Sequence, residues 1–190
     1  MASTTTSLTD QELSALRKAA ARFTPRPGYY AGLNPANVIR WALETGQHPS
    51  VLADPEGHRV RIERERNGLF YVKWDRPKKR GADAASGVPI GRTEQEVAWA
   101  RETLASFLPR RSARSYARLV DEVAKAAGIT GRVSMRTLRH TYLTQLARKA
   151  LDPAVVVQLG NVSPREAIRY TKGAAMDRDV EVFERMREGA

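Results

Sequence analysis

The stretch that decides the fold of this chain reads Met135-Arg136-Thr137-Leu138-Arg139-His140-Thr141-Tyr142-Leu143. Ser134 precedes it as a good N-cap and apolar residues recur at helical spacing, which predicts an amphipathic helix over residues 135–148. Arg136, Arg139 and His140 share one face of that helix, because residues three and four apart are neighbours on a helix surface. The helix dipole favours an anion near the N-terminus, where these side chains stand. Two guanidiniums and an imidazole in that place predict a phosphate site.

Two further helix starts follow in the sequence. Asp152-Pro153 combines an N-cap with a proline at the first helical position, and predicts a short helix that Gly160 can stop. Ser163 and Glu166 have the spacing of a capping box, so they open another helix. That helix carries Tyr170 two turns from its start, and the tyrosine is thus placed on a helix of its own.

The order of these features resembles the catalytic core of the tyrosine recombinases, the phage-integrase family. In that family an arginine in a His-x-x-Arg-His run binds the scissile phosphate, a Leu-Gly-His or Leu-Gly-Trp run adds a donor, and a tyrosine attacks. The resemblance implies catalytic roles for Arg139, Arg136, His140, Asn161 and Tyr170. Arg136 stands where the family usually has His, and Asn161 where it has His or Trp. Both side chains donate hydrogen bonds to phosphate oxygens, but neither relays a proton as His does.

The first catalytic arginine of the family has no clear counterpart in this chain. The family places it in a Thr-Gly-Leu-Arg-x-x-Glu-Leu run, and the best match here, residues 45–52, puts His48 on the arginine and Val51 on the glutamate. An alternative match at Gly32-Leu33-Asn34 puts Asn34 there, and Arg40 is a further candidate from nearby in the sequence. Loss of one preorganised donor to a transition-state oxyanion typically costs on the order of 10² to 10³ in rate. The sequence is therefore compatible with retained and with lost strand cleavage.

A lysine that protonates the leaving 5′-oxygen lies in a β-turn of the family, and Lys78 and Lys79 occupy the corresponding turn here. The alternative is an ordinary charged turn that touches the DNA backbone. Lys73, on the preceding strand, is a third candidate for the general acid.

The remaining elements complete a mainly α fold with a small antiparallel β-sheet, an α+β class that the resemblance equates with the tyrosine-recombinase catalytic domain. A capping box at Thr9 and Glu12 opens the first helix, and Asn34-Pro35 opens a second that ends at Gly46. We expect residues 47–57 to be a connection. Two runs of alternating residues around Asn67-Gly68 predict a hairpin. A short strand at 87–90 and helices over 93–108 and 112–128 follow.

The composition indicates a nucleic-acid partner. The chain carries a formal net charge of +11, and 25 of its 32 basic residues are Arg, the side chain best suited to bidentate phosphate contacts. We therefore expect double-stranded DNA as the partner. A solvated face is the alternative for any one cluster. The residues predicted to touch DNA are Arg76, Arg80, Arg110, Arg111, Arg114 and Arg118.

Several protein classes are excluded by composition. With no Cys and three His, disulfide frameworks and zinc fingers are ruled out, and we expect neither a metal nor a cofactor. No apolar run approaches the roughly 20 residues that span a bilayer, and residues 1–6 lack the basic and apolar regions typical of a signal peptide. We expect a cytoplasmic, nucleoid-associated protein with no membrane partner.

The predicted organisation has three parts: a disordered tip at 1–7, an integrase-like catalytic domain at 8–175, and an amphipathic helix at 176–190 that follows a break at Gly173. In the family such a tail often packs on a neighbouring subunit, so the resemblance implies a homo-oligomer on DNA. We expect these residues to contain no separate N-terminal core-binding domain, and to be either a minimal member of the family or a fragment.

The function implied by the resemblance is that of an integrase or site-specific recombinase from a phage or mobile element. Such an enzyme cleaves and rejoins DNA through a 3′-phosphotyrosine intermediate. The main alternative is a DNA-binding protein that retains the fold and has lost cleavage. A type IB topoisomerase and a helical interaction module are two further possibilities.

Overall fold

The structure is a computed structural model that describes residues 7–25, 30, 32–75, 85–108, 111–150 and 152–188, with the side chains at 85, 86, 177 and 179–188 left aside. Its helices are α1 (Asp10–Arg22), α2 (Pro35–Thr45), α3 (Pro49–Ala53), α4 (Glu94–Ser106), α5 (Ala113–Ala126), α6 (Met135–Ala150), α7 (Pro153–Gly160) and α8 (Pro164–Glu188). Its strands are β1 (Arg61–Arg64), β2 (Phe70–Asp75) and β3 (Ala85–Gly91). The chain divides between Thr141 and Tyr142 into two compact units, the first unit and the second unit.

Local capping fixes the first helices where the sequence predicts them. The Thr9 hydroxyl accepts from the Glu12 amide at 3.2 Å, and the Glu12 carboxylate accepts from the Thr9 amide at 2.8 Å, so the predicted capping box is present. Asn34 caps α2 by accepting from the Ala36 amide at 3.0 Å. Gly46 ends α2 with φ of 56°, a left-handed conformation that glycine adopts without strain.

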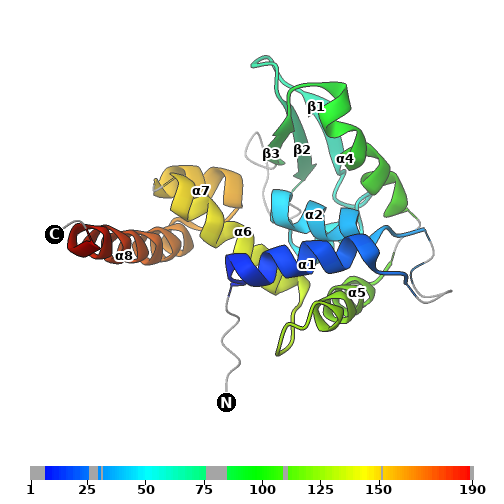
Figure 1. Cartoon of the computed structure of the whole chain (residues 1–190). Helices are drawn as coiled ribbons and strands as arrows, with labels where there is room; N and C mark the ends of the chain where they lie inside the picture. The colour runs from blue at the N-terminus through cyan, green and yellow to red at the C-terminus, as the bar shows by residue number, and fades with distance from the viewer. Residues whose placement is uncertain are drawn as a thin grey trace. The chain divides into compact units, whose positions relative to one another are not determined.

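The three strands form one antiparallel sheet in the order β1-β2-β3 (Figure 1). Phe70, Val72 and Trp74 of β2 are buried, whereas Lys73 and Asp75 lie on the other face, as the alternation of a half-buried strand requires. The predicted hairpin is confirmed. Its turn closes with the Gly68 amide donating to the Glu65 carbonyl at 2.9 Å.

A line of aromatic rings joins three helices in the core of the first unit. Trp41 of α2 meets Trp99 of α4 at 6.2 Å between ring centroids, and meets Phe107 at 5.4 Å. Phe107 in turn meets Tyr116 of α5 at 5.6 Å, and all three contacts are edge-to-face. Such pairs contribute about 0.5–1.5 kcal/mol each beyond the area they bury. The rings therefore fix α2, whose C-terminal end leads into the candidate site.

The second unit has a small core made of short side chains. Ala147 of α6, Val156 of α7, and Ala167 and Ala174 of α8 are buried together. No helix in the described part of the chain is long and apolar enough to cross a membrane.

Three local predictions differ from the structure. Residues 49–53 form α3 rather than part of a connection, because His48 acts as the N-cap and Pro49 takes the first helical position. The predicted break at Gly173 is wrong: α8 continues through it, since buried Ala167 and Ala174 on either side outweigh the cost of about 1 kcal/mol for a helical glycine. Gly160 is the last residue of α7, and Asn161 takes the left-handed cap instead.

The prediction of a disordered tip falls outside the described residues, apart from Ser7.

Candidate functional site

The start of α6 places the predicted phosphate ligands. Ser134 caps the helix by accepting from the Thr137 amide at 3.3 Å, which confirms the predicted start. Leu138 is fully buried and anchors this turn in the core of the first unit. Arg136 is exposed, and Arg139 and His140 are half-buried, so the three ligands lie along the boundary between core and solvent.

Arg139 reaches back to the end of α2. Its guanidinium donates a hydrogen bond to the carbonyl of Gly46, a residue 93 positions earlier in the sequence. The C-terminal end of a helix carries partial negative charge, so a cation is favoured there. This contact brings the arginine of α6 to the segment that the sequence alignment matched with the first catalytic arginine.

The segment before His48 is fixed by buried polar contacts. Thr45 and Gln47 are each only 1% exposed. The Trp41 indole donates to the Gln47 side-chain oxygen at 2.8 Å, and the Thr45 hydroxyl donates to the Trp41 carbonyl at 2.7 Å. Another backbone path would leave these buried hydrogen-bonded groups without their partners, which is costly. The peptide that leads to His48 therefore has a defined position.

His48 lies beside the arginines of α6. Although the residue is exposed, partial desolvation lowers the pKa of its imidazole, and the positive charges of Arg139 and then Arg136 lower it further. The charge of His58 acts in the same direction. The first unit thus gathers Arg136, Arg139 and His48 in one place, which we term the cationic cluster.

The other candidates for the missing arginine have different partners. The Arg40 guanidinium pairs with Glu44 at 2.8 Å and stacks on the Trp99 ring at 3.9 Å. Asn34 is the N-cap of α2. Of the sequence candidates, His48 is the one that the structure brings to Arg139.

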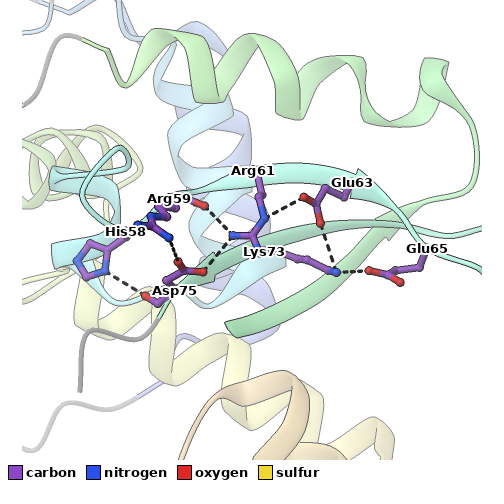
Figure 2. A network of polar contacts seen from close by, with 7 residues as sticks. All are labelled: His58, Arg59, Arg61, Glu63, Glu65, Lys73 and Asp75. Carbon is purple, nitrogen blue, oxygen red and sulfur yellow. Dashed lines mark hydrogen bonds and ion pairs between the residues drawn. The ribbon is translucent and has the colours of Figure 1, made fainter. Parts of the chain in front are cut away.

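Lys73 belongs to a charged network on the outer face of the sheet (Figure 2). Its ammonium contacts the Glu65 carboxylate and lies 3.4 Å from that of Glu63. The hydrogen bond to Glu65 raises the pKa of Lys73, and Glu63 acts in the same direction. A raised pKa makes the ammonium a weaker acid, so Lys73 is poorly suited to protonate a leaving oxygen at neutral pH.

The same network anchors the end of β2. Arg61 donates to the Asp75 carboxylate at 3.1 Å, and the Asp75 amide donates to the His58 carbonyl at 2.8 Å.

The predicted general acids Lys78 and Lys79 and the predicted DNA contacts Arg76 and Arg80 lie outside the described residues.

The second unit carries the predicted nucleophile and one predicted phosphate donor. Tyr170 is half-buried on α8 and packs against the small core of that unit. Asn161 has φ of 50° and ψ of 50°, a left-handed conformation that asparagine tolerates better than most residues. Its backbone thus has a structural role at the end of α7. The predicted roles of both residues in catalysis stay predictions.

The basic ridge on α5 is partly engaged within the protein. Arg114 and Arg118 are exposed on the side of the helix opposite to buried Leu119 and Val120. Arg111 is half-buried and donates to the Ser106 carbonyl at 2.8 Å, which ties it to the end of α4. Arg110 lies outside the described residues. The exposed pair is therefore the better candidate for contact with a phosphate backbone.

The chemistry of the cationic cluster suits an anion. Guanidinium groups only donate hydrogen bonds, and an imidazole adds a donor that can titrate. The described residues contain no group of three or more His, Asp or Glu side chains that could hold a metal ion. A phosphate oxygen is the ligand that this set of donors fits best.

Comparison with solved structures identifies the fold. The chain aligns with the structure of a XerH site-specific recombinase bound to palindromic difH substrate, a post-cleavage complex, with a TM-score of 0.68, 17% identity, and coverage of 94% of this chain and 53% of that one. A pre-cleavage complex of XerH with difH gives a TM-score of 0.64, 18% identity, and coverage of 87% and 50%. The structure of XerA recombinase gives a TM-score of 0.61 and 19% identity, with coverage of 92% of this chain and 62% of that one.

These likenesses confirm the predicted fold class. This chain has the tyrosine-recombinase fold, mainly helical with a small antiparallel sheet. It spans between half and about three-fifths of the length of the chains it resembles. No protein-family model matches the sequence, and no curated protein does so either.

Sequence reasoning did not find the residues that support the cluster. Gln47 and Ser50 are polar residues that belong to no recognisable motif. Every residue has a backbone carbonyl, so the sequence does not indicate that the one of Gly46 accepts a hydrogen bond from Arg139. The His48-Pro49 pair was the available signal, since proline at the first helical position predicts a helix start. Histidine is not among the common N-cap residues, so the signal is weak.

Proposed function

We propose that this protein cleaves and rejoins DNA strands as a tyrosine recombinase. The observation that carries the proposal is the cationic cluster in a chain with the recombinase fold: the Arg139 guanidinium is held at Gly46, next to the segment that presents His48. Phosphoryl transfer depends mainly on positioning and on stabilising charge at the phosphate oxygens. A fixed cluster of donors meets that requirement.

The proposed reaction is an in-line displacement at one DNA phosphate. The Tyr170 hydroxyl gives its proton to water as its oxygen forms a bond to phosphorus. The bond from phosphorus to the 5′-oxygen breaks, and a 3′-phosphotyrosine remains. Lys78 or Lys79 gives a proton to the leaving 5′-oxygen, which becomes a 5′-hydroxyl. Attack by a 5′-hydroxyl of another strand reverses these steps and releases Tyr170.

The phosphate ligands have separate roles in this scheme. Arg139 and Arg136 offset the negative charge that develops on the phosphorane, and Asn161 adds an uncharged donor. His140 donates to the same phosphate or steadies Arg139. Arg136 and Asn161 cannot relay protons, so proton transfer falls to the lysines.

Binding to double-stranded DNA is supported by the net charge of +11 and by the exposed Arg114 and Arg118 on α5. Each phosphate contact releases counterions, so DNA affinity should fall steeply with salt. Removal of one phosphate-binding arginine lowers the slope of log K against log salt by about one. Replacement of Arg114 by Ala tests this contact directly.

Assembly through the C-terminal helix is proposed with a second copy of this chain as partner. Met176 of α8 is 70% exposed and Ile168 is 44% exposed, which leaves large apolar side chains on this helix in contact with solvent. Loss of self-association on DNA in Met176→Glu would support this assembly. Unchanged self-association would contradict it.

The test is covalent capture on nicked DNA. A pool of nicked duplexes with a randomised centre is incubated with the protein, and the nick lets the short 5′-hydroxyl fragment diffuse away after cleavage. Protein-linked DNA is then isolated under denaturing conditions. Capture by the wild type and its absence in Tyr170→Phe support the proposal.

The alternatives give different results in the same assay. DNA binding without any adduct indicates a protein that has the fold and lacks cleavage. Adducts without sequence preference, together with relaxation of supercoiled DNA, indicate a type IB topoisomerase. Weak DNA binding that does not respond to salt indicates a helical interaction module.

A further inference from the structure

We propose that the two ring nitrogens of His48 have separate tasks: Nδ1 caps α3 through Ser50, and Nε2 carries the proton that binds the DNA phosphate beside Arg139. The proposal rests on the proposed function, because it names a ligand for the same phosphate. It also makes Ser50 a positioning residue, which acts on the phosphate through His48.

The contacts of His48 assign its tautomer. The Ser50 amide lies 3.3 Å from Nδ1, and the Ser50 hydroxyl oxygen lies 2.9 Å from the same atom. A backbone amide can only donate, so Nδ1 must be the acceptor in this contact. In a neutral imidazole the proton then lies on Nε2. The nitrogen that remains to bind a ligand is therefore a hydrogen-bond donor.

The backbone on both sides of His48 is anchored in the core. Gln47 is buried and accepts from the Trp41 indole, while Val51 and Leu52 of α3 are buried on the other side. Arg139 contacts Gly46, two residues before His48. A donor held in this way needs little reorganisation when a phosphate arrives, and such preorganisation is a main source of transition-state stabilisation.

The charges around His48 keep its ring neutral until an anion binds. Arg139 and Arg136 face it from α6, and His58 faces it from the loop before β1; together with desolvation they lower the pKa of His48. A bound phosphate offsets these positive charges and raises the pKa again. Binding is therefore coupled to proton uptake, and DNA affinity should rise as the pH falls toward the lowered pKa of the free protein.

The Ser50 hydroxyl makes both charge states possible. Protonated Nδ1 becomes a donor and can no longer accept from the Ser50 amide. The hydroxyl oxygen, 2.9 Å away, can then accept from it. In Ser50→Ala the amide still fixes the neutral tautomer, but the protonated ring loses its partner. The gain in DNA affinity on acidification should therefore be smaller in Ser50→Ala than in the wild type.

Two substitutions of His48 distinguish the roles of its two ring nitrogens. The side-chain oxygen of asparagine occupies the place of Nδ1, so His48→Asn keeps the cap and has no donor at the place of Nε2. The amide nitrogen of glutamine reaches the place of Nε2, so His48→Gln keeps an uncharged donor, and glutamine is a poor cap.

The expected results follow from that division. His48→Asn should melt within about 2 °C of the wild type, because the cap is retained, and should lose on the order of 10²-fold in the rate of adduct formation. His48→Gln should keep the rate within about 10-fold, because a donor is retained. It should melt lower than the wild type and lose the rise in DNA affinity on acidification.

The experiment combines adduct formation on the nicked-duplex pool with imidazole nitrogen spectra of the histidine-labelled protein. The chain has only His48, His58 and His140, so substitution of each assigns the signals. We expect the Nε2-protonated tautomer for His48 at pH 7.5 without DNA. The Nδ1-protonated tautomer would overturn the proposal, whether or not the protein cleaves DNA.

The outcomes for the two proposals remain distinct. Wild-type adduct formation with an equal rate in His48→Asn overturns the role of Nε2 and leaves the recombinase function in place. Absence of adduct in the wild type overturns the cleavage function instead. In that case, the pH dependence of duplex affinity in the wild type and His48→Asn decides the role of Nε2: equal curves overturn it.

Discussion

The two units of this protein place their proposed functional residues by different means. In the first unit, the cationic cluster depends on contacts between distant parts of the chain: Arg139 with Gly46, and Trp41 with Gln47 in the segment before His48. In the second unit, Tyr170 is placed by a local helix start at Ser163 and by a core of small side chains. The charged groups proposed to bind phosphate thus come from the unit with the larger core, and that unit holds them by long-range contacts.

The difference predicts how each region responds to substitution. Replacement of Arg139 should lower the rate of cleavage and the stability of the first unit together, because its contact with the Gly46 carbonyl serves both. Changes at the proposed functional residues of the second unit, Asn161 and Tyr170, should affect the rate more than the stability, since both are only half-buried.

The largest effect is expected for Arg139→Lys. Lysine keeps the charge and lacks the planar fork, so it cannot hold the Gly46 carbonyl and a phosphate in the same geometry. The rate of adduct formation should fall by on the order of 10² to 10³, and the first unit should melt at a lower temperature. Arg101→Lys is the control, because Arg101 pairs with Glu94 on the exposed face of α4. Equal rates in both variants would contradict the role of Arg139.

The next largest effect is expected for Asn161→Gly. Glycine adopts the left-handed conformation of this cap freely, so the end of α7 should be preserved and the melting temperature unchanged. The amide donor is lost, and adduct formation should slow by on the order of 10². An unchanged rate would show that Asn161 acts only as the cap of α7.

Trp41→Phe tests the polar support of the cluster. The substitution leaves the buried Gln47 side-chain oxygen without its donor, at a cost of about 1–3 kcal/mol. For a chain of this size, that corresponds to a fall of roughly 2–4 °C in melting temperature per kcal/mol. Trp99→Phe is the matched control: the Trp99 indole nitrogen is buried and has no hydrogen-bond partner among the described residues. A larger loss in Trp99→Phe, measured by thermal unfolding, would contradict the proposed support.

Two glycines of the second unit offer a matched pair. A Cβ at Gly160 would lie 2.6 Å from a methyl carbon of buried Leu143, so Gly160→Ala should destabilise the unit by about 1–3 kcal/mol through overpacking. A Cβ at Gly173 meets no atom within 4 Å, so Gly173→Ala should stabilise α8 by about 0.5–1 kcal/mol. Chemical denaturation measures both. Destabilisation by Gly173→Ala would contradict a continuous α8.

The smallest effect is the dependence of stability on pH. The pKa of His48 in the folded protein is lowered from its ordinary value of 6.5, so below pH 6.5 the unfolded chain binds a proton that the folded chain resists. Stability should therefore fall as the pH drops from about 6.5 toward the folded pKa. His48→Gln lacks this contribution, and its unfolding free energy should vary less over that window. Parallel curves for the two proteins would contradict the lowered pKa.

Much of the fold follows from local sequence rules. The capping pairs Thr9–Glu12 and Ser163–Glu166 form as predicted, and so does the hairpin around Gly68. Each of these depends on residues within a few positions of one another. Gly173 shows the limit of such rules, since packing of the alanines beside it outweighs the helix propensity of one residue.

The candidate site was predictable only in part. The face shared by Arg136, Arg139 and His140 follows from helical spacing within one helix. The approach of Arg139 to Gly46 depends on tertiary packing between segments 93 positions apart, and periodicity holds no information about it. The place of His48 beside the arginines followed from the family resemblance. The contact of its Nδ1 with Ser50 depends on the side-chain rotamer and on the backbone at the start of α3, which residue spacing does not determine.

The most direct test of the account is to locate the covalent bond in the captured complex. Protein linked to the nicked-duplex pool is digested with a protease and a nuclease, and the peptide that carries a residual nucleotide is sequenced by mass spectrometry. If Tyr170 is the nucleophile, we expect one modified peptide, with the nucleotide attached through its 3′-phosphate to Tyr170. A nucleotide on any other residue, or a wild-type protein that binds the duplexes tightly and carries none, would contradict it.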